Sequence, residues 1–150
     1  MNWNKLWEMF REIFSSEAEE QPWATVDKPS PRDIIPQKDI KYIKGTKKIE
    51  ISNIPPTIWL TTVRDTNSMD GCIDHGHTCI LTDNFDPREL AVGDVVVYWS
   101  GTQDIIHRIV EIGTDEEGRY YRLKGDNCYA IDPYLVRGKH IRWLLLGVIY

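Results

Sequence analysis

Four short clusters of polar residues lie between residues 66 and 132 of this chain, and each holds side chains that could do chemistry. They occupy residues 66–71, 93–97, 107–109 and 124–127, and Asp132 follows the last of them. A serine hydroxyl such as that of Ser68 becomes a nucleophile when a base stands beside it. An imidazole such as that of His107 can take that proton near neutral pH and return it to a leaving group. Each cluster alone is a weak signal, since a Ser-Met pair is common and a single histidine on a strand is more often structural.

In their order along the chain, these clusters resemble the signal peptidase I family of serine proteases, in the variant shared by archaeal and endoplasmic-reticulum enzymes. The similarity runs from about Thr57 to Tyr150. It comprises Ser-Met at 68–69, a hydrophobic strand opened by Gly-Asp at 93–94, His-Arg at 107–108, and Lys-Gly-Asp-Asn at 124–127 with a further aspartate six residues after Asp126. The resemblance implies a mostly β fold of the signal peptidase/LexA-like type, a coiled β-sheet of incomplete barrels. It also implies a serine endopeptidase that cleaves after small residues in an extended peptide, bound along a strand edge.

The resemblance also implies roles for individual residues. Ser68 would be the nucleophile and His107 the general base, with Asp132 accepting a hydrogen bond from the far ring nitrogen. Asp126 matches a second acid of the family, which either orients His107 or braces the turn. The Ser68 N–H and the Thr66 hydroxyl would form the oxyanion hole, which stabilises the negative charge that develops on the substrate. No metal and no organic cofactor are implied.

The same residues also have purely structural interpretations. Ser68 is compatible with an ordinary turn, which Gly71 would suit. Asp126 and Asp132 are typical turn-capping residues, and Lys124 would be a solvated charge at a strand end. Lys124 is also a rival base, because related proteases pair serine with lysine. It lies outside the strand on which that base belongs, so His107 is the preferred base.

Three positions depart from the family pattern. Gly71 stands where a proline is usual, His77 where an aspartate is usual, and Cys128 where an asparagine is usual. None of them is a proposed catalytic residue. Because glycine restricts the backbone less than proline does, Gly71 predicts a looser nucleophile loop.

A different chemistry is suggested by four zinc-ligand side chains within eight residues, namely Cys72, His75, His77 and Cys79. Structural zinc sites usually hold their ligands as two pairs on separate loops, with a longer gap between the pairs. Alternation along the following strand would instead turn Cys79 into the core. The pattern favours ordinary loop and strand residues over a metal site.

Short runs of β-branched and aromatic residues follow one another from about Lys47 to the end of the chain. They predict strands at 58–63, 78–81, 94–99, 105–112, 119–124 and 141–149. The sequence Asp-Glu-Glu-Gly at 115–118 predicts a hairpin turn between two of them. Strands do not alternate with helices, so a parallel α/β sheet is excluded and a mostly β domain over residues 47–150 is expected.

The first 46 residues have a different character. Residues 1–20 carry an apolar stripe at helical spacing, which predicts an amphipathic helix. The stripe consists of Trp3, Leu6, Trp7, Phe10, Ile13 and Phe14. Prolines at 22, 29, 31 and 36 predict a linker over residues 21–46. The helix has a net charge of −3, so we expect it to dock on its own body, on a second subunit of a homo-oligomer or on a protein partner, rather than to make peripheral membrane contact through residues 1–14.

The overall composition excludes several classes of protein. A net charge of −5 and scattered basic residues argue against nucleic-acid binding. No stretch approaches the roughly 20 apolar residues of a membrane span, and the N-terminus lacks the features of a secretory signal. We therefore expect a cytoplasmic protein whose partner is a peptide or protein substrate. Two other functions stay open: a self-cleaving regulator of the LexA-like type, cut at Ala24-Thr25, and an inactive peptide-binding or assembly module.

Overall fold

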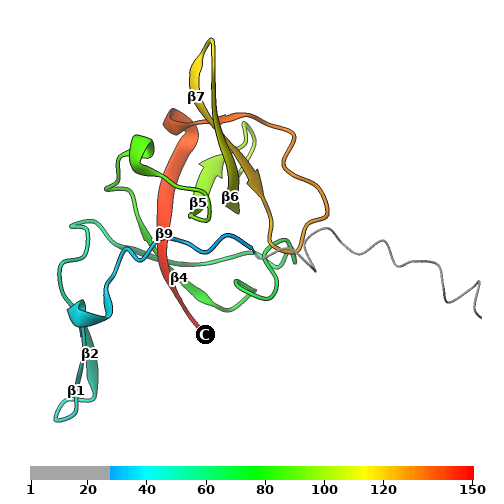
Figure 1. Ribbon diagram of the computed structural model, residues 1–150. Helices are drawn as coiled ribbons and strands as arrows, with labels where there is room; N and C mark the ends of the chain where they lie inside the picture. The colour runs from blue at the N-terminus through cyan, green and yellow to red at the C-terminus, as the bar shows by residue number, and fades with distance from the viewer. Residues whose placement is uncertain (1–27) are drawn as a thin grey trace, which may run out of the picture.

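The structure, a computed structural model, describes residues 28–150, and this part is mostly β (Figure 1). Seven strands form one antiparallel sheet in the order β3-β4-β9-β5-β6-β7-β8, and two more form a separate hairpin, β1–β2. The strands of the main sheet are β3 (Trp59–Thr62), β4 (Thr78–Thr82), β5 (Val95–Trp99), β6 (Asp104–Asp115), β7 (Gly118–Lys124), β8 (Val136–Arg137) and β9 (Ile141–Ile149). The mostly β prediction is confirmed. The amphipathic helix predicted over residues 1–20 lies outside the described residues.

Helical structure in residues 28–150 is limited to short 3-10 turns. They are η1 (Gln37–Asp39), η2 (Pro87–Glu89) and η3 (Gly138–His140). No helix in this part of the chain is long and apolar enough to cross a membrane.

Each of the six segments predicted as strands overlaps a strand of the main sheet. The largest difference in bounds is at β6, which continues to Asp115 because its pairing with β7 persists as far as Gly118. The predicted turn lies there, and Gly118 has a φ of 100°, a value that favours glycine. Strand β8 was not predicted, since two residues are too few to show an alternating pattern.

Strand β5 is buried on both faces and divides the core into two clusters. Val96 and Tyr98 pack into one cluster with residues of β6, β7 and β9, while Val95 and Val97 pack into the other. The second cluster also contains Met69, which directly follows the proposed nucleophile. The core therefore fixes the middle of the loop between β3 and β4.

The sheet is bent by irregular pairing and ends in two open edges. Its register shifts occur at Ile80/Leu81 between β4 and β9, at Val97/Tyr98 between β5 and β9, and at Ile109/Glu111 between β6 and β7. Such bulges increase the local twist of the strands that carry them. Strands β3 and β8 are the edges, so the sheet does not close into a barrel.

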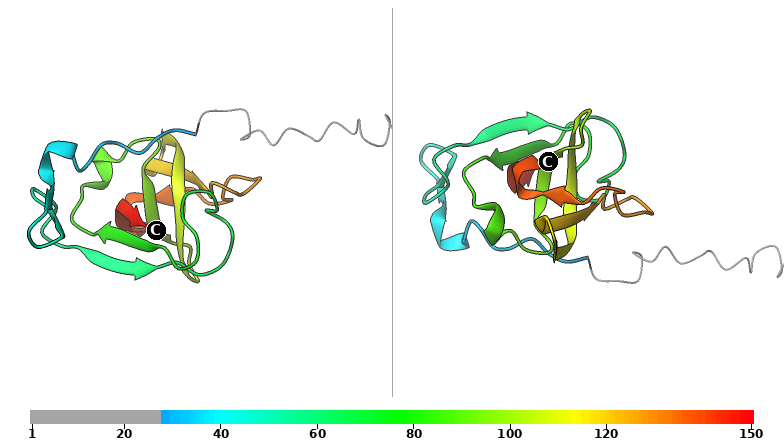
Figure 2. Two further views of the ribbon diagram at one scale, coloured as in Figure 1. Left: turned by 90° about the horizontal axis from the view of Figure 1, so that it is seen from below. Right: turned by 90° about the horizontal axis from the view of Figure 1, so that it is seen from above.

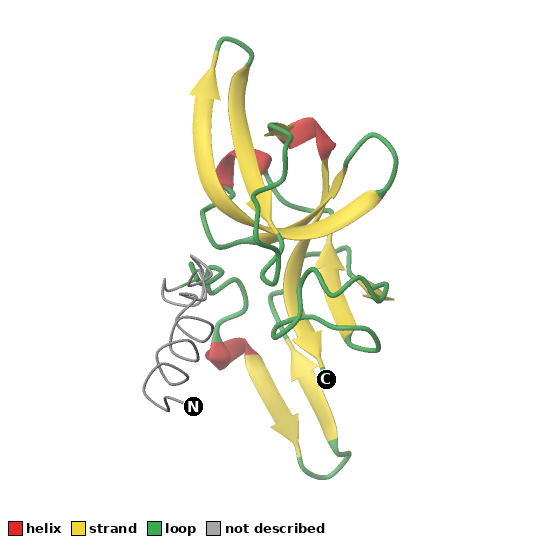
Figure 3. Ribbon diagram, turned by 90° about the vertical axis from the view of Figure 1, so that its right-hand side faces the viewer, coloured by secondary structure: helices red, strands yellow, loops and turns green. Residues whose placement is uncertain are grey.

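Residues 40–51 form a hairpin of β1 (Ile40–Ile43) and β2 (Lys48–Ile51), which projects from the end of the molecule opposite the β6–β7 turn (Figures 1 and 3). The expected boundary between linker and domain, after residue 46, therefore falls inside its turn. The prolines that suggested a linker end at residue 36. Beyond them the chain can pair with itself, and the hairpin spans the predicted boundary, with β1 before it and β2 after it.

The segment from Lys28 to Pro36 lies along one side of the body, away from edge strand β3 (Figure 2). Arg32 forms an ion pair with the fully buried carboxylate of Asp94 at 2.9 Å. A Cβ atom at Gly93 would lie 2.1 Å from the Ser30 carbonyl oxygen, so this approach requires glycine. This part of the predicted linker is draped over the domain.

Candidate active site

His107 and Asp132 form the centre of the candidate site. His107 is buried on β6, and its Nδ1 lies 2.7 Å from Oδ2 of Asp132. Asp132 lies in the loop between β7 and β8, where its N–H donates to the Leu123 carbonyl at 2.8 Å. A carboxylate on Nδ1 favours the tautomer with the proton on that nitrogen, which leaves Nε2 able to accept a proton. The predicted pairing of these two residues is present.

A third side chain, which the sequence did not suggest, completes this arrangement. The hydroxyl of Tyr98 donates to the same Asp132 oxygen at 2.8 Å. Tyr98 is almost fully buried, and burial together with the Asp132 carboxylate raises the pKa of its hydroxyl. The hydroxyl therefore stays protonated and serves as a donor. Its apolar setting in β5 made Tyr98 look like a core residue.

Ser68 lies in the loop between β3 and β4, just after a residue in the left-handed backbone region. Asn67 has a φ of 57°, which asparagine tolerates better than most residues. The following turn is closed by bonds from the Cys72 and Ile73 N–H groups to the Met69 carbonyl, at 3.2 Å and 2.9 Å. The side chain of Ser68 is half-buried at this turn.

The Lys-Gly-Asp-Asn segment at 124–127 and the following Cys128 form hydrogen bonds with the loop that contains Ser68. The Asn127 N–H donates to the Ser68 carbonyl at 3.0 Å, and the Asn127 side-chain amide donates to the Asn67 carbonyl at 2.9 Å. The Cys128 thiol also donates to the Ser68 carbonyl, at 3.7 Å. Asn127 was not assigned a role from the sequence, although it belongs to the motif that carries the resemblance. Its hydrogen bonds join the Lys-Gly-Asp-Asn motif to the Ser-Met motif, which is distant in sequence.

Gly125 lies where the nucleophile loop and the His107 ring meet. A Cβ atom there would lie 2.4 Å from the Ser68 carbonyl oxygen, 2.5 Å from Cys128 Sγ and 2.8 Å from His107 Nε2. The Ser68 carbonyl and Nε2 of His107 thus both lie beside Gly125. No side chain fits between them.

The Ser68 hydroxyl itself is paired with another hydroxyl. Its Oγ lies 3.3 Å from Oγ1 of Thr66, and the contacts among residues 28–150 include no hydrogen bond between Ser68 and His107. The Ser68 N–H likewise has no protein acceptor in this part of the chain. The two predicted oxyanion donors, the Thr66 hydroxyl and the Ser68 N–H, thus lie at the Ser68 side chain, which forms no hydrogen bond with His107.

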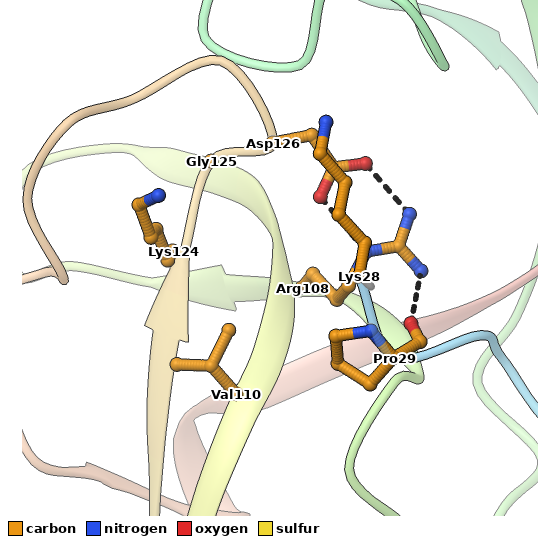
Figure 4. A pocket seen from close by; sticks show the side chains of 7 residues that line it. All are labelled: Lys28, Pro29, Arg108, Val110, Lys124, Gly125 and Asp126. Carbon is orange, nitrogen blue, oxygen red and sulfur yellow. Dashed lines mark hydrogen bonds and ion pairs between the residues drawn. The ribbon is translucent and has the colours of Figure 1, made fainter. Parts of the chain in front are cut away.

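Asp126 does not contact His107. It accepts two hydrogen bonds from the buried Arg108 guanidinium, at 2.8 Å from Nε and 2.6 Å from Nη2 (Figure 4). Arg108 also donates to the carbonyls of Gly93 and Pro29. Of the two roles expected for Asp126, orienting the base or bracing the turn, the structure supports the second. His107 and Arg108 point to opposite sides of β6, which separates the two acids.

Lys124 is buried rather than a solvated charge at a strand end. It is 2% exposed, and burial lowers the pKa of its ammonium group. It lines a small pocket with Arg108 and Asp126, and the Gly125 backbone lies between its ammonium group and that ion pair (Figure 4). It is not among the residues lining the groove that contains Ser68 and His107.

Among the described residues, the four possible zinc ligands form no cluster that could hold a metal ion. Cys79 is fully buried in the core, as alternation along β4 predicted. The Cys72 sulfur lies 3.9 Å from the Arg108 guanidinium. The His77 ring packs edge-on against Tyr150, with centroids 4.6 Å apart, and its Nδ1 accepts from the Asp74 N–H.

A groove of about 820 Å³ runs past the candidate site. Thr66, Ser68 and His107 line it, together with the whole of edge strand β3 and apolar side chains that include Trp59, Leu60, Val97, Trp99 and Trp143. Because β3 has a neighbour on one side alone, its other edge is open to a further strand. The groove can therefore hold an extended peptide beside the serine.

One departure from the family pattern has a structural explanation. Gly71 has a φ of 88°, whereas proline is fixed at about −65°. The turn after Ser68 thus has a conformation that a proline could not adopt. Buried Met69 and Ile73 anchor the loop on either side of Gly71.

Comparison of this chain with protein-family models, with curated proteins and with solved structures finds no match.

Proposed function

We propose that this protein is a serine endopeptidase of the signal peptidase I type. Ser68 is its nucleophile, His107 its general base and Asp132 the acid that orients the base. The observation that carries the proposal is the contact of His107 with Asp132 at 2.7 Å, at the wall of a groove that Ser68 also lines. The loop after β3, strand β6 and the loop after β7 each contribute one of these residues, and this set of side chains supports a proposal of acyl transfer.

The reaction follows from this arrangement. Ser68 Oγ attacks the carbonyl carbon of the substrate while His107 Nε2 takes the hydroxyl proton. Asp132 stabilises the imidazolium that forms, and the Thr66 hydroxyl and Ser68 N–H donate to the oxyanion. Breaking of the carbon–nitrogen bond is completed when Nε2 returns the proton to the leaving amine. A water molecule, activated by the same nitrogen, then hydrolyses the ester and restores Ser68.

The missing bond between Ser68 and His107 fits this mechanism. Hydrogen bonds of this kind are often long or misaligned in the free enzyme and tighten when substrate binds. The Thr66 hydroxyl that now pairs with Ser68 is an oxyanion donor in the proposal. When a substrate carbonyl takes up that donor, the Ser68 hydroxyl is released to turn toward Nε2.

The substrate is a polypeptide in extended form. An edge strand offers backbone N–H and C=O groups to a peptide, and the groove beside it has room for side chains. As in the family that the sequence resembles, we propose small residues next to the cut.

Labelling with a fluorophosphonate tests the proposal directly, because this reagent reacts with activated serine hydroxyls. We expect one adduct on the intact chain, located at Ser68 by peptide mass spectrometry. His107→Ala should slow labelling by roughly 10²-fold or more, the contribution of a general base. Labelling at equal rates in the wild type and in His107→Ala, or at other serines alone, would overturn the proposal.

A further inference from the structure

The β1–β2 hairpin is amphipathic, and its apolar face is exposed. In its register Ile40 opposes Ile51 and Tyr42 opposes Ile49, so these four side chains share one face. Ile40, Tyr42 and Ile49 are 43%, 64% and 70% exposed. The opposite face carries the pairs Lys41–Glu50 and Ile43–Lys48.

A two-stranded ribbon of this kind is marginal in water without a further layer. The hairpin belongs to its own two-stranded sheet, and the register pairs of β1 and β2 join them to each other and not to the main sheet. Figures 1 and 3 show it projecting from the body. Burying the apolar face of such a ribbon against another surface would stabilise it, so this face is a candidate interaction site.

The hairpin is also basic, in a chain that is acidic as a whole. Residues 37–51 contain lysines at 38, 41, 44, 47 and 48 against Asp39 and Glu50, a net charge of +3. The whole chain has a net charge of −5. The occupant of the apolar face should therefore present apolar side chains beside acidic ones.

One segment of the same chain has both properties. Residues 1–20 have the apolar stripe at helical spacing described above, and five glutamates against Lys5 and Arg11 give them a net charge of −3. We propose that residues 1–20 dock on the hairpin, with their apolar stripe against Ile40, Tyr42, Ile49 and Ile51. Their glutamates then lie beside the hairpin lysines.

Residues 28–36 run along the body between the first described residue and the hairpin (Figure 2). Residues 21–27 join the segment to Lys28 and can span about 25 Å when extended. The same contact can form within one chain or between two copies, since a protruding hairpin is accessible to both. An anionic membrane is the other surface that a basic, apolar hairpin would suit, but residues 1–20 would be repelled by it.

Zero-length cross-linking of the full chain with a carbodiimide tests the proposal, because it joins carboxylates to lysines already in contact. We expect links from Glu8, Glu12, Glu17, Glu19 or Glu20 to the hairpin lysines at 38–48. Links from these glutamates to Lys28 or Lys139 in place of the hairpin, or no links from them, would overturn it. A mixture of unlabelled and ¹⁵N-labelled chains then assigns the contact to one copy or two, and either result supports the proposal.

Matched variants make the test independent of hairpin folding. Ile49→Asp, on the apolar face, should abolish the links, whereas Ile43→Asp, on the charged face, should retain them. Trp7→Asp leaves the hairpin sequence intact and should abolish the links in the same way. If Ile49→Asp and Ile43→Asp behave alike while Trp7→Asp keeps its links, the proposal is wrong.

Vesicle sedimentation tests the alternative that the hairpin binds a membrane. Vesicles of phosphatidylcholine and phosphatidylserine are sedimented with the full chain and with Ile49→Asp. We expect neither protein to sediment with them. Binding by the wild type that Ile49→Asp abolishes would show that the hairpin face binds lipid and would overturn the proposal.

Discussion

Tyr98 and His107 contact the same oxygen of Asp132, at 2.8 Å and 2.7 Å. Both side chains come from neighbouring strands, β5 and β6, which pair directly at Val96 and His107. Tyr98, which belongs to the core, therefore holds the Asp132 carboxylate in place by a hydrogen bond, and His107, which lines the groove, contacts the same carboxylate. Tyr98 acts as a positioning residue in the proposed mechanism, since it reaches the base through Asp132.

Tyr98→Phe tests that role. Removing the hydroxyl should lower the free energy of unfolding by about 1 kcal/mol, the usual net contribution of a hydrogen bond. It should also lower kcat by up to roughly tenfold and leave KM unchanged, because His107 is less firmly oriented. Peptide-cleavage kinetics and urea unfolding provide the two measurements.

Tyr121→Phe is the matched control for Tyr98→Phe. Tyr121 is also buried and donates its hydroxyl to the Pro87 carbonyl, away from the candidate site. It should show a similar loss of stability with kcat unchanged. Equal effects of both variants on kcat would assign Tyr98 a purely structural role.

Thr66→Val tests the oxyanion hole. The variant keeps the shape of the side chain but removes the donor, so kcat should fall by about 10²–10³-fold with little change in KM. Thr66 is exposed, and its stability should therefore change little. Thr66→Ser, which keeps a hydroxyl, should restore most of the activity. Full activity in Thr66→Val would remove the residue from the mechanism.

Gly125→Ala tests the approach of the nucleophile loop to His107. The added methyl group would collide with the Ser68 carbonyl and with His107 Nε2. We expect a loss of activity larger than the loss of stability, compared by kcat/KM and by thermal unfolding. In Gly147→Ala the added Cβ would meet its nearest neighbour at 3.9 Å, an ordinary contact, so this control should retain activity. Normal activity in Gly125→Ala would show that the two groups need not be adjacent.

Asp126→Asn tests the assignment of Asp126 as a structural acid. Burial alone would raise the pKa of Asp126, but the Arg108 guanidinium outweighs it and lowers the pKa below its ordinary value. The ion pair therefore contributes its full stability above about pH 4, the pKa of an unfolded aspartate, and loses it as pH falls through the lower folded value. The variant leaves Arg108 buried without its partner, which should cost about 3–5 kcal/mol at neutral pH.

Urea unfolding across a pH series gives the measurement. The stability difference between wild type and Asp126→Asn should be constant above about pH 4 and shrink toward acid pH. Asp86→Asn, which removes an exposed ion pair with Arg88, serves as the control and should change stability little. A difference that grows toward acid pH would contradict the assignment.

Much of this fold could be predicted from local patterns, and the exceptions have physical causes. Strands such as Val95–Trp99 and Ile141–Ile149 are recognisable because β-branched and aromatic residues gather where the chain is buried. The β1–β2 hairpin was missed because neighbouring prolines suggested a linker and its strands have four residues each. Its apolar alternation is real, but it is short and lies among lysines.

The candidate site was predicted in part, for a related reason. Ser68, His107 and Asp132 belong to motifs whose residue types indicate chemistry. Tyr98 and Gly125 carry no such signal, because their roles arise from contacts between segments distant in sequence. Asp126 could be identified as important, but its partner could not, since alternation along β6 decides whether His107 or Arg108 meets it.

Peptide cleavage by the full chain and by three variants tests whether Ser68 and His107 hydrolyse a peptide bond. The protein is incubated alone and with a library of peptides containing small residues, and the products are identified by mass spectrometry. We expect defined cuts by the wild type, which Ser68→Ala and His107→Ala abolish and Lys124→Met retains. Cuts within the chain's own residues 21–27 would identify self-cleavage by the same site. Cleavage that persists in Ser68→Ala and His107→Ala, or that is lost in Lys124→Met alone while all four proteins are folded, would contradict the account.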